Sequence, residues 1–580
     1  MLAILASTLT TVAVFLPIGF VPGMVGEIFL NLALTIVFSL AASYLVAIMV
    51  VPLMASRIIK VSGEVSHPLM DRVAASLSRL LGFLLRSPVR CVGYFVIVLA
   101  VFGVSLMFFP PQEFFPSMDR GTFVVSFETP EGTSVEQTDL ITAAIERQLR
   151  TYPEVEKLIS RTEMAEGSIT VVLKPVKQRK RTTADIISAS RAEISRIPGF
   201  TDIFYNEMRM GPPQSGKPIS IQVSGEKFEQ LEEICLMIAG KISSVKGLKD
   251  LNNGVKKGRP EIKIEFDREK IRDLGINLAG ISGMVRSFVY GTVAGKYKES
   301  NEEYDIRVEA DDPYKDRIEK VRNMQFTIDK GVRVTLSQIA RIYQDRGYSQ
   351  IERSNLKKIL KVEADSEGRA QGLVISDIQK ILSTIELPQG YEAKFGGEEE
   401  DRAEAFGNLG YALIAAVCLV YMVMAAQFES FLYPFVIMFT IPLSVIGVVL
   451  SLRLSGYAFS VTAMIGIIML AGIVVNNGII LIDYINRRRT LHGENRIDAC
   501  LTACTVRMRP IMMTTMTTVC GMLPLALGIG AGADFFQPLA ITVIGGLIFS
   551  MVLTLTFIPV TYTIVDTGRE WAARLMFGRK

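Results

Sequence analysis

Eight long stretches of this 580-residue chain contain no Asp, Glu, Lys, Arg or His. A helix of about 20 apolar residues crosses a bilayer, and each stretch is long enough to hold one. Charged residues still make up 21% of the chain, because apolar and charged segments alternate along it. We therefore expect a membrane domain of eight transmembrane helices and one large polar part. The stretches are residues 1–26, 28–56, 91–112, 405–428, 430–452, 454–482, 510–533 and 535–565.

The chain also contains a repeat. Residues 4–55 align without a gap with residues 511–562, and 15 of the 52 aligned positions are identical, with prolines and a glycine kept in register. Such self-similarity indicates a duplicated unit. The second copy follows three more apolar stretches and a long polar segment, so we expect the chain to begin within its first repeat. The matched pairs include Pro17 with Pro524, Gly23 with Gly530 and Pro52 with Pro559.

Basic residues predict the orientation of the membrane domain. Residues 57–90 contain six Arg or Lys and two acidic residues, and residues 487–509 contain six arginines. Short loops rich in Arg and Lys stay in the cytoplasm, so both segments are expected there. Residues 58–90 also have an amphipathic pattern, which predicts a connector on the cytoplasmic membrane face. Threading the helices from there places residues 113–404 outside and the tail, residues 567–580, inside.

The external segment has the alternating patterns of strands and amphipathic helices. Residues 113–212 give strand, helix, strand twice over, which is the ferredoxin-like pattern. A second such unit, residues 213–258 and 353–404, is interrupted by an insertion at residues 259–352. The predicted fold is an α-helical membrane domain with a large extracytoplasmic α+β region of ferredoxin-like units. A hairpin at residues 290–308 is expected to protrude from the insertion.

Three motifs carry a resemblance to a known family. They are AAQFESFLYPFVIMFTIPLSVIG (Ala425 to Gly447), GIVVNNGIILIDYINRRR (Gly472 to Arg489) and RMRPIMMTTMTT (Arg507 to Thr518). Together with the layout of the chain, they resemble the C-terminal half of a resistance-nodulation-division (RND) efflux permease of the hydrophobe/amphiphile exporter branch.

The resemblance implies a role for each segment. Residues 1–57 would be family spans five and six, residues 91–112 span seven, and residues 405–566 spans eight to twelve. The two ferredoxin-like units would be porter subdomains 1 and 2, and the insertion a docking subdomain.

The resemblance also implies an activity. The family exports amphiphilic or drug-like compounds in exchange for protons, as an inner-membrane homotrimer that works with a periplasmic adaptor and an outer-membrane channel. We therefore expect a secondary transporter, not an enzyme, with no cofactor and no nucleic-acid partner. The sequence has neither a GxxxxGK[ST] loop nor a GxGxxG turn after a strand, so it gives no support to an ATP-driven mechanism.

A proton pathway through lipid needs a titratable group with polar partners. Asn476 and Asn477 are the most polar intramembrane residues, and asparagine does not titrate. In the family an acidic pair on span four accepts the proton and a lysine on span ten often faces it; Asn476 stands at the lysine position. We expect Asn476 and Asn477 to orient carboxylates outside this chain, with Thr514 in the same network and Arg507 at its cytoplasmic entrance. For the asparagines, amide hydrogen bonds that hold helices together are the alternative. Packing is the alternative for Thr514, and anchoring by positive charge on the inner side is the alternative for Arg507.

By resemblance, the substrate cleft lies between the two ferredoxin-like units. Alternate residues of two strands are expected to line it, and ordinary sheet surface is the alternative. The heavy-metal branch of the family uses cleft methionines; Met164 and Met208 raise that possibility, but the Val124 strand offers no third methionine and no metal site is predicted. The expected lining residues are Val124, Ser126, Glu128, Phe204, Asn206 and Met208.

Other functions stay open from the sequence. A heavy-metal cation exporter of the same family, a SecD/SecF-like translocation accessory and an inactive truncated fragment are the alternatives to a drug or amphiphile exporter.

Overall fold

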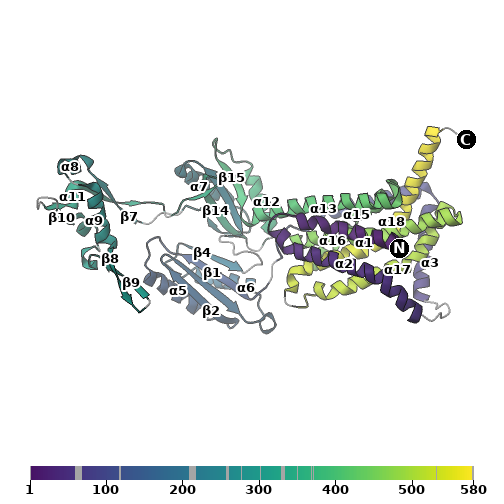
Figure 1. The fold of residues 1–580 in the computed structure, drawn as a ribbon, viewed down its shortest axis with the longest axis horizontal. Helices are drawn as coiled ribbons and strands as arrows, with labels where there is room; N and C mark the ends of the chain where they lie inside the picture. Colours follow the sequence, from purple (N-terminus) through teal and green to yellow (C-terminus); the bar gives the residue numbers. More distant parts are fainter. Residues whose placement is uncertain are drawn as a thin grey trace.

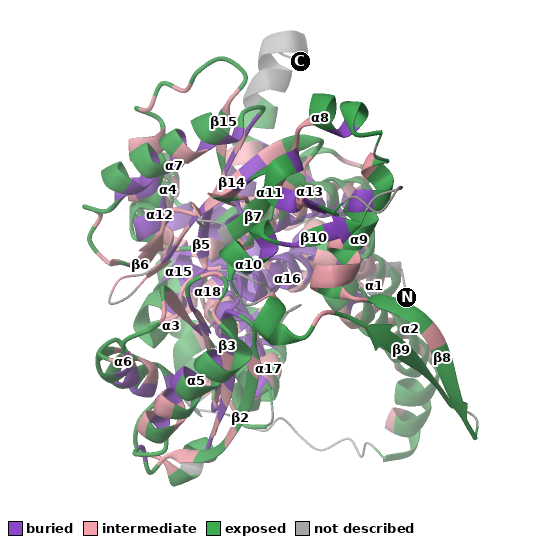
Figure 2. Cartoon of the chain, turned by 90° about the vertical axis from the view of Figure 1, so that its left-hand side faces the viewer, coloured by how far each residue is buried: buried purple, intermediate pink, exposed green. Residues whose placement is uncertain are grey.

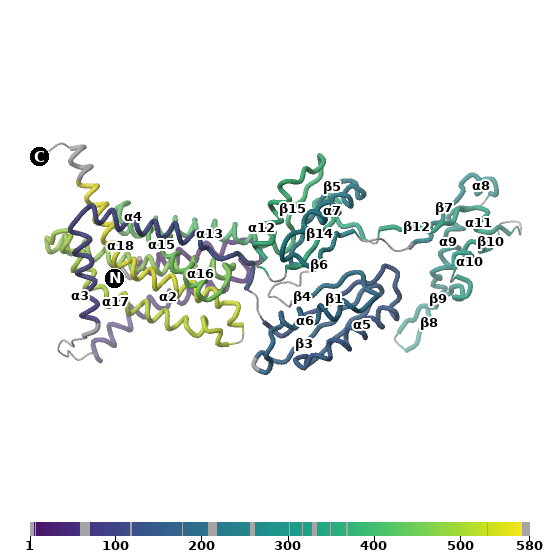
Figure 3. The backbone as a smooth tube through the Cα atoms, turned by 180° about the vertical axis from the view of Figure 1, so that it is seen from behind, coloured from purple at the N-terminus to yellow at the C-terminus, as the bar shows by residue number. Residues whose placement is uncertain are grey.

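The molecule is elongated, with a helical bundle at one end, two α/β units in the middle and a third α/β part at the far end (Figures 1 and 3). These parts belong to a computed structural model that describes residues 2–58, 68–116, 119–207, 217–255, 260–275, 277–300, 302–315, 317–327, 333–348, 350–366, 369, 371–530 and 532–577.

The bundle contains the apolar stretches. Among the described residues, six helices are long and apolar enough to cross a membrane: Gly23–Ile58, Pro88–Met107, Glu398–Phe428, Leu432–Ser455, Val461–His492 and Ala533–Glu570. Its elements are α1 (Leu2–Phe15), η1 (Leu16–Phe20), α2 (Gly23–Ile58), α4 (Pro88–Met107), α13 (Glu398–Phe428), α14 (Leu432–Met438), α15 (Thr440–Ser455), α16 (Val461–His492), α17 (Arg496–Ala526) and α18 (Ala533–Phe577).

The expected eight spans are therefore not all present as long apolar helices. In residues 1–26, α1 passes directly into η1, and this helical segment ends at Phe20. Its apolar part, Ser7–Phe20, is one of the shorter apolar helices and not a candidate span. Helix α17 has 31 residues, but its first half carries Arg496, Arg507 and Arg509, and it ends at Ala526. Its uncharged part is shorter than the stretch counted from the sequence, and its threonines lower its hydropathy.

The helices approach closely where small residues meet. A Cβ built on Gly447 of α15 would lie 2.3 Å from the carbonyl oxygen of Gly545 on α18, and one on Gly545 would lie 2.4 Å from the Cβ of Ser451. Small residues allow such backbone contact between helices in membranes. Buried positions gather between the helices of the bundle and inside the α/β parts (Figure 2).

The two copies of the repeat have matching backbone features. Gly23, the first residue of α2, has φ +82°, and Gly530, shortly before α18, has φ +124°, a region that favours glycine. Pro52 and Pro559 both lie inside the following helices. The repeat therefore extends from sequence to backbone conformation.

The connector forms α3 (Pro68–Leu85), which packs against the bundle through the buried Leu81, Leu84 and Leu85. Asp71 on α3 makes an ion pair of 2.5 Å with Arg509 on α17. The amphipathic connector thus joins the helical bundle.

The first external unit has the strand order β2-β3-β1-β4, which is that of a ferredoxin-like sheet. Strand β1 alternates strictly, with Phe123, Val125 and Phe127 buried against the helices. The elements are β1 (Thr122–Glu128), α5 (Val135–Leu149), β2 (Val155–Glu163), β3 (Glu166–Leu173), η2 (Val176–Gln178), α6 (Thr183–Ile194) and β4 (Asp202–Glu207).

The second unit repeats this order around β14, which pairs with both β5 and β6, while β15 pairs with β5. It comprises β5 (Ile219–Gly225), α7 (Phe228–Ile242), β6 (Leu248–Asn252), β13 (Glu352–Ser354), β14 (Lys357–Ser366), α12 (Gln371–Leu382) and β15 (Glu392–Gly396).

The insertion leaves this unit after β6 and returns along β12, which pairs with β7. Its hairpin of β8 and β9 is almost wholly exposed and projects from the molecule (Figure 2). The elements are β7 (Pro260–Phe266), α8 (Arg268–Asp273), α9 (Leu278–Tyr290), β8 (Thr292–Glu299), β9 (Glu302–Val308), η3 (Asp312–Tyr314), α10 (Ile318–Arg322), β10 (Gln325–Thr327), β11 (Arg333–Thr335), α11 (Leu336–Ile339) and β12 (Ala340–Arg346).

Candidate transport sites

A polar contact joins α1 and α16 inside the bundle. The Ser7 hydroxyl donates a hydrogen bond to the side-chain oxygen of Asn476, and both residues are half-buried. The two helices pack closely here, because a Cβ built on Gly472 would lie 3.3 Å from the Cβ of Val14. Thr10 and Thr11 each donate to the backbone oxygen of Ser7 at 2.9 Å. Asn477, the other predicted asparagine, is also half-buried on α16.

Arg507 lies on α17, toward the arginine-rich end of the bundle from this contact. Its guanidinium carbon is 4.8 Å from the ring centroid of Tyr484, which is a favourable cation–π distance. Tyr484 follows Asn476 by eight residues on α16, about 12 Å along the helix axis. The Nε of Arg507 is buried without a hydrogen-bond partner among the described residues. Arg507 therefore flanks the polar contact without reaching it directly.

Thr514 is exposed, and its hydroxyl donates to the backbone oxygens of Pro510 at 3.2 Å and Ile511 at 3.0 Å. The structure brings Ser7 to Asn476, but not Thr514. Ser7 and Thr514 are nevertheless equivalent positions, because the two copies of the repeat are offset by 507 residues. The repeat thus carried a signal for Ser7 that the analysis of single motifs missed.

A second cluster lies near the end of α16 and was not anticipated. Asp566 on α18 pairs with Arg489 at 3.0 Å and with Arg496 at 3.3 Å. The Tyr562 hydroxyl donates to the Asn486 side-chain oxygen at 2.8 Å and accepts from Arg489 at 2.8 Å. These contacts hold α16, α17 and α18 together where the arginine-rich segment begins.

The predicted cleft residues share one face of the first external sheet. Val124 is paired with Asn206 across β1 and β4, and Ser126 is paired with Phe204. In β1 these residues alternate with the buried core positions, so they face away from α5 and α6. Glu128 lies opposite Asp202 at the end of the same pair of strands. Met208 lies outside the described residues.

Charged side chains connect this unit to the second one. Arg191 on α6 pairs with Asp250 on β6 at 2.6 Å and with Asp365 on β14 at 3.0 Å. Lys217 lies 3.2 Å from Asp202 and 5.3 Å from the centre of the Phe204 ring. The two units are therefore tied together beside the predicted lining residues.

Asp250 is the most unusual member of this charge cluster. Its backbone has φ +48°, a region that non-glycine residues rarely adopt. Burial raises the pKa of Asp250, although Arg191 and Lys217 oppose the rise. Asp365 sits beside an irregularity in the pairing of β14 with β6. Local distortions of the backbone place both carboxylates against one guanidinium.

No group of three His, Cys, Asp or Glu side chains within the described ranges is arranged to hold a metal ion. Met164 is half-exposed, with 50% of its surface accessible.

The fold and these sites define a membrane protein with a helical bundle and a large α/β portion that carries a charged junction between two units. Residues 1–566 match the model of the AcrB/AcrD/AcrF family. The chain belongs to this family of RND permeases, and it resembles their C-terminal half.

Several curated proteins are similar to the chain. The swarming motility protein SwrC of Bacillus subtilis is 29% identical over 98% of this chain and 55% of its own length. The cobalt-zinc-cadmium resistance protein CzcA of Cupriavidus metallidurans is 27% identical over 96% and 55%. The multidrug resistance protein MdtC of Escherichia coli K12 is 26% identical over 100% and 57%. The chain therefore spans about half the length of the curated relatives it matches.

A crystal structure of a heavy metal efflux pump has a TM-score of 0.82 at 23% identity, and the match covers 97% of this chain and 58% of that one. At this level of identity, the match supports the fold alone.

Proposed function

We propose that the chain is part of a proton-driven RND exporter of amphiphilic or drug-like compounds. The observation that carries the proposal is the Ser7 to Asn476 hydrogen bond between helices of the bundle. Polar groups within a membrane domain are costly, and where they occur they commonly mark ion pathways. An asparagine at this position orients a proton carrier but cannot itself carry the charge.

The proton-accepting carboxylates would come from an N-terminal half that works together with this chain. Two observations support this. The relatives are about twice as long as the matched region, and the described residues of the bundle interior offer an amide and hydroxyls instead of an acid at Asn476. By the repeat, Thr514 would contact the missing helix equivalent to α16, as Ser7 contacts Asn476. Arg507 would hold a fixed positive charge at the cytoplasmic entrance, where it attracts anionic groups, and Asn477 would support the same network.

The cargo would pass between the two external units. We assign residues 113–212 to porter subdomain 1 and residues 213–258 with 353–404 to porter subdomain 2. Val124, Ser126, Glu128, Phe204, Asn206 and Met208 would line the path, and the aromatic, apolar and hydroxyl groups among them suit amphiphiles. Separation of the units would require the Arg191 contacts to break.

Residues 259–352 would form the docking subdomain, with the exposed β8–β9 hairpin as its contact with neighbouring chains. The proposed assembly is a homotrimer of complete transporters in the inner membrane, with the α/β portion extracytoplasmic and joined to a periplasmic adaptor and an outer-membrane channel.

Heavy-metal export is the second candidate, because the name of the relative CzcA refers to resistance to cobalt, zinc and cadmium. The described residues of the cleft give it little support, since Met164 is the only methionine among them near the first sheet and no cluster of ligands is formed.

The test is export from cells that produce the complete transporter and lack their own pumps. We expect the amount of retained dye to fall relative to vector controls and to rise again when the proton gradient is collapsed. Tolerance to zinc and cobalt should stay unchanged. Metal tolerance without dye export would support the heavy-metal exporter instead. The absence of both dye export and metal tolerance would contradict both candidates.

A further inference from the structure

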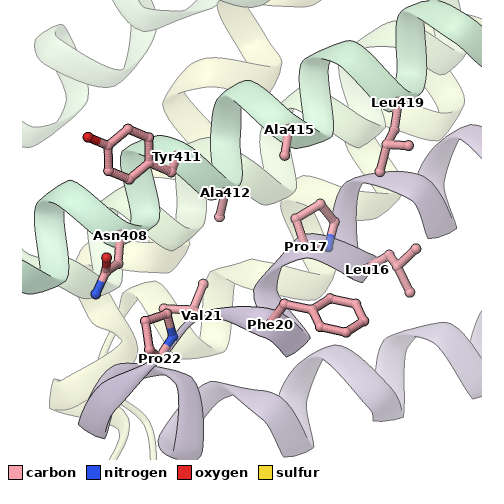
Figure 4. Close-up of a pocket in the computed structure, with 10 residues that line it drawn as sticks. All are labelled: Leu16, Pro17, Phe20, Val21, Pro22, Asn408, Tyr411, Ala412, Ala415 and Leu419. Carbon is pink, nitrogen blue, oxygen red and sulfur yellow. The ribbon is translucent and has the colours of Figure 1, made fainter.

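A groove runs along the surface of the bundle between α13 and the turn that joins α1 to α2 (Figure 4). Its cavity is about 440 Å³, within the size range of small-molecule sites. Pro17, Phe20 and Pro22 form one wall, and Asn408, Tyr411 and Ala412 belong to the other. The groove is distinct from the Asn476 site and from the junction of the external units.

The sequence explains why space remains here. Pro17 within η1 and Pro22 after it restrict the backbone, and Gly23 adopts φ +82°, so the chain turns sharply instead of packing a side chain against α13. Ala412 on α13 presents only a methyl group to the groove. Phe20 and Tyr411 are 80% and 74% exposed, so two aromatic rings stand at its rim.

The groove lies toward the external end of the bundle. Helix α13 begins at Glu398, directly after the last strand of the second external unit, and Asn408 follows ten residues later, about 15 Å along the axis. The lining of α13 extends to Leu419, about another 16 Å, which is the length scale of a dodecyl chain. The polar Asn408 is at the outer end of this lining, and apolar residues follow.

A carboxylate stands at the outer end. Glu404 lies one helical turn before Asn408, and a Cβ built on Gly23 would be 3.8 Å from its Oε1, so its side chain reaches across to the turn. Glu404 is exposed and makes no hydrogen bond or ion pair with the described parts of the chain. The nearby Arg402 is engaged by Glu399 and Gln112. A cation placed beside Glu404 would thus meet an unneutralised acid at the outer end of the groove.

We propose that this groove binds a cationic amphiphile, with its alkyl chain between the η1 turn and α13 and its ammonium group beside Glu404. Charge complementarity selects the occupant, because an anionic or neutral amphiphile gains nothing from the carboxylate. The inference rests on the proposed export of amphiphiles and names the charge class of that cargo.

The experiment measures equilibrium binding to this chain in lipid nanodiscs, without a proton gradient. The probe is radiolabelled dodecyltrimethylammonium, with dodecyl maltoside and dodecyl sulfate as neutral and anionic comparisons. We expect the ammonium to bind about five- to tenfold more tightly than dodecyl maltoside. Equal affinities for the three probes would overturn the proposal, since they would show ordinary partitioning into lipid.

Two variants locate the site. Glu404→Gln should remove the preference for the ammonium and leave dodecyl maltoside binding unchanged, whereas Glu429→Gln at the opposite end of α13 should change neither. Ala415→Leu fills the groove and should weaken all specific binding, whereas Ala100→Leu on the exposed side of α4 should not. An unchanged preference in Glu404→Gln would overturn the proposal.

The outcome is separable from that of the proposed function. Binding in nanodiscs without export by the complete transporter would contradict the export function and leave the groove as a site. Export of the ammonium without binding by this chain would contradict the proposed binding site in the groove and leave the proposed export function intact.

Discussion

The Ser7 hydroxyl on α1 donates a hydrogen bond to the Asn476 side-chain oxygen on α16, and this contact links two helices 469 positions apart in the sequence. A half-buried asparagine inside the bundle has two possible roles. It can hold two helices together, or it can hold a proton-carrying group in place. A substitution distinguishes the two roles. Loss of a contact that holds helices together lowers stability, whereas loss of a contact that orients a proton carrier lowers coupled transport.

Ser7→Ala tests the first role. Hydrogen bonds between membrane helices contribute about 0.6 to 2 kcal/mol, so we expect a small loss in the free energy of unfolding. We expect a larger effect on proton-coupled export, measured with the complete transporter in proteoliposomes. Ser56→Ala is the matched control, because that hydroxyl donates to the backbone oxygen of Leu53 on its own helix. A loss of stability without any change in export would show that the contact only holds the two helices together.

Thr514→Ala tests the equivalence that the repeat predicts. Thr514 and Thr517 are both exposed and both bond to carbonyls of their own helix, yet only Thr514 corresponds to Ser7. We expect Thr514→Ala to lower the export rate about tenfold, roughly the loss of one hydrogen bond of 1.4 kcal/mol in the transition state. Thr517→Ala should retain the rate. Equal rates in the two variants would remove Thr514 from the proton pathway.

Arg191→Ala should loosen the junction of the two external units. Arg191 is the shared partner of Asp250 and Asp365, and its loss leaves two carboxylates facing each other. Spin labels at the exposed Leu140 and Leu236 would report the separation of the units by pulsed electron resonance, and we expect a longer and broader distance distribution. Arg147→Ala is the control, since its guanidinium bonds to Ala143 of its own helix. An unchanged distribution would show that the Arg191 ion pairs do not hold the units together.

Two aspartates of the external units should respond to pH in opposite directions. Burial would raise the pKa of Asp119, but hydrogen bonds from Arg179 and Thr183 outweigh it and lower that pKa. The stabilisation by Asp119 is therefore present above its unfolded pKa of about 4 and is lost as pH falls through the lower folded value. The pKa of Asp250 is raised, so its favourable contribution is present below about pH 4 and is lost as pH rises through the raised value.

Asparagine substitutions at the two positions should therefore differ at pH 7. Asp119→Asn should lower the free energy of unfolding by about 1 to 3 kcal/mol, because the half-exposed carboxylate accepts charge-assisted hydrogen bonds. Asp250→Asn should leave it unchanged or raise it. Thermal unfolding of the full chain between pH 4 and 8 measures both, and a large loss in Asp250→Asn would contradict the sign argued here.

The sequence predicted the outline of the fold because its signals are local or periodic. Uncharged stretches located the helices, and strict alternation in residues 122–128 located the face that carries Val124 and Ser126. The number of long apolar helices was overestimated, since counting uncharged residues ignores the end of the first helical segment at Phe20 and the polarity of α17.

The contacts that define the sites were harder to predict. Arg191 is an ordinary basic residue on an amphipathic helix, and only the tertiary arrangement brings it to Asp250 and Asp365. Ser7 could have been found from its repeat partner Thr514, but Asn476 has no repeat partner inside this chain to confirm the pairing.

The most direct test of the account is the coupling of proton flux to cargo export by Asn476. Proteoliposomes that contain the complete transporter would be given a pH gradient, and proton uptake and dye movement would be recorded together for the parent and for Asn476→Ala. We expect both fluxes to fall together in the variant while binding of the dye persists. Undiminished coupled transport by Asn476→Ala would contradict the account.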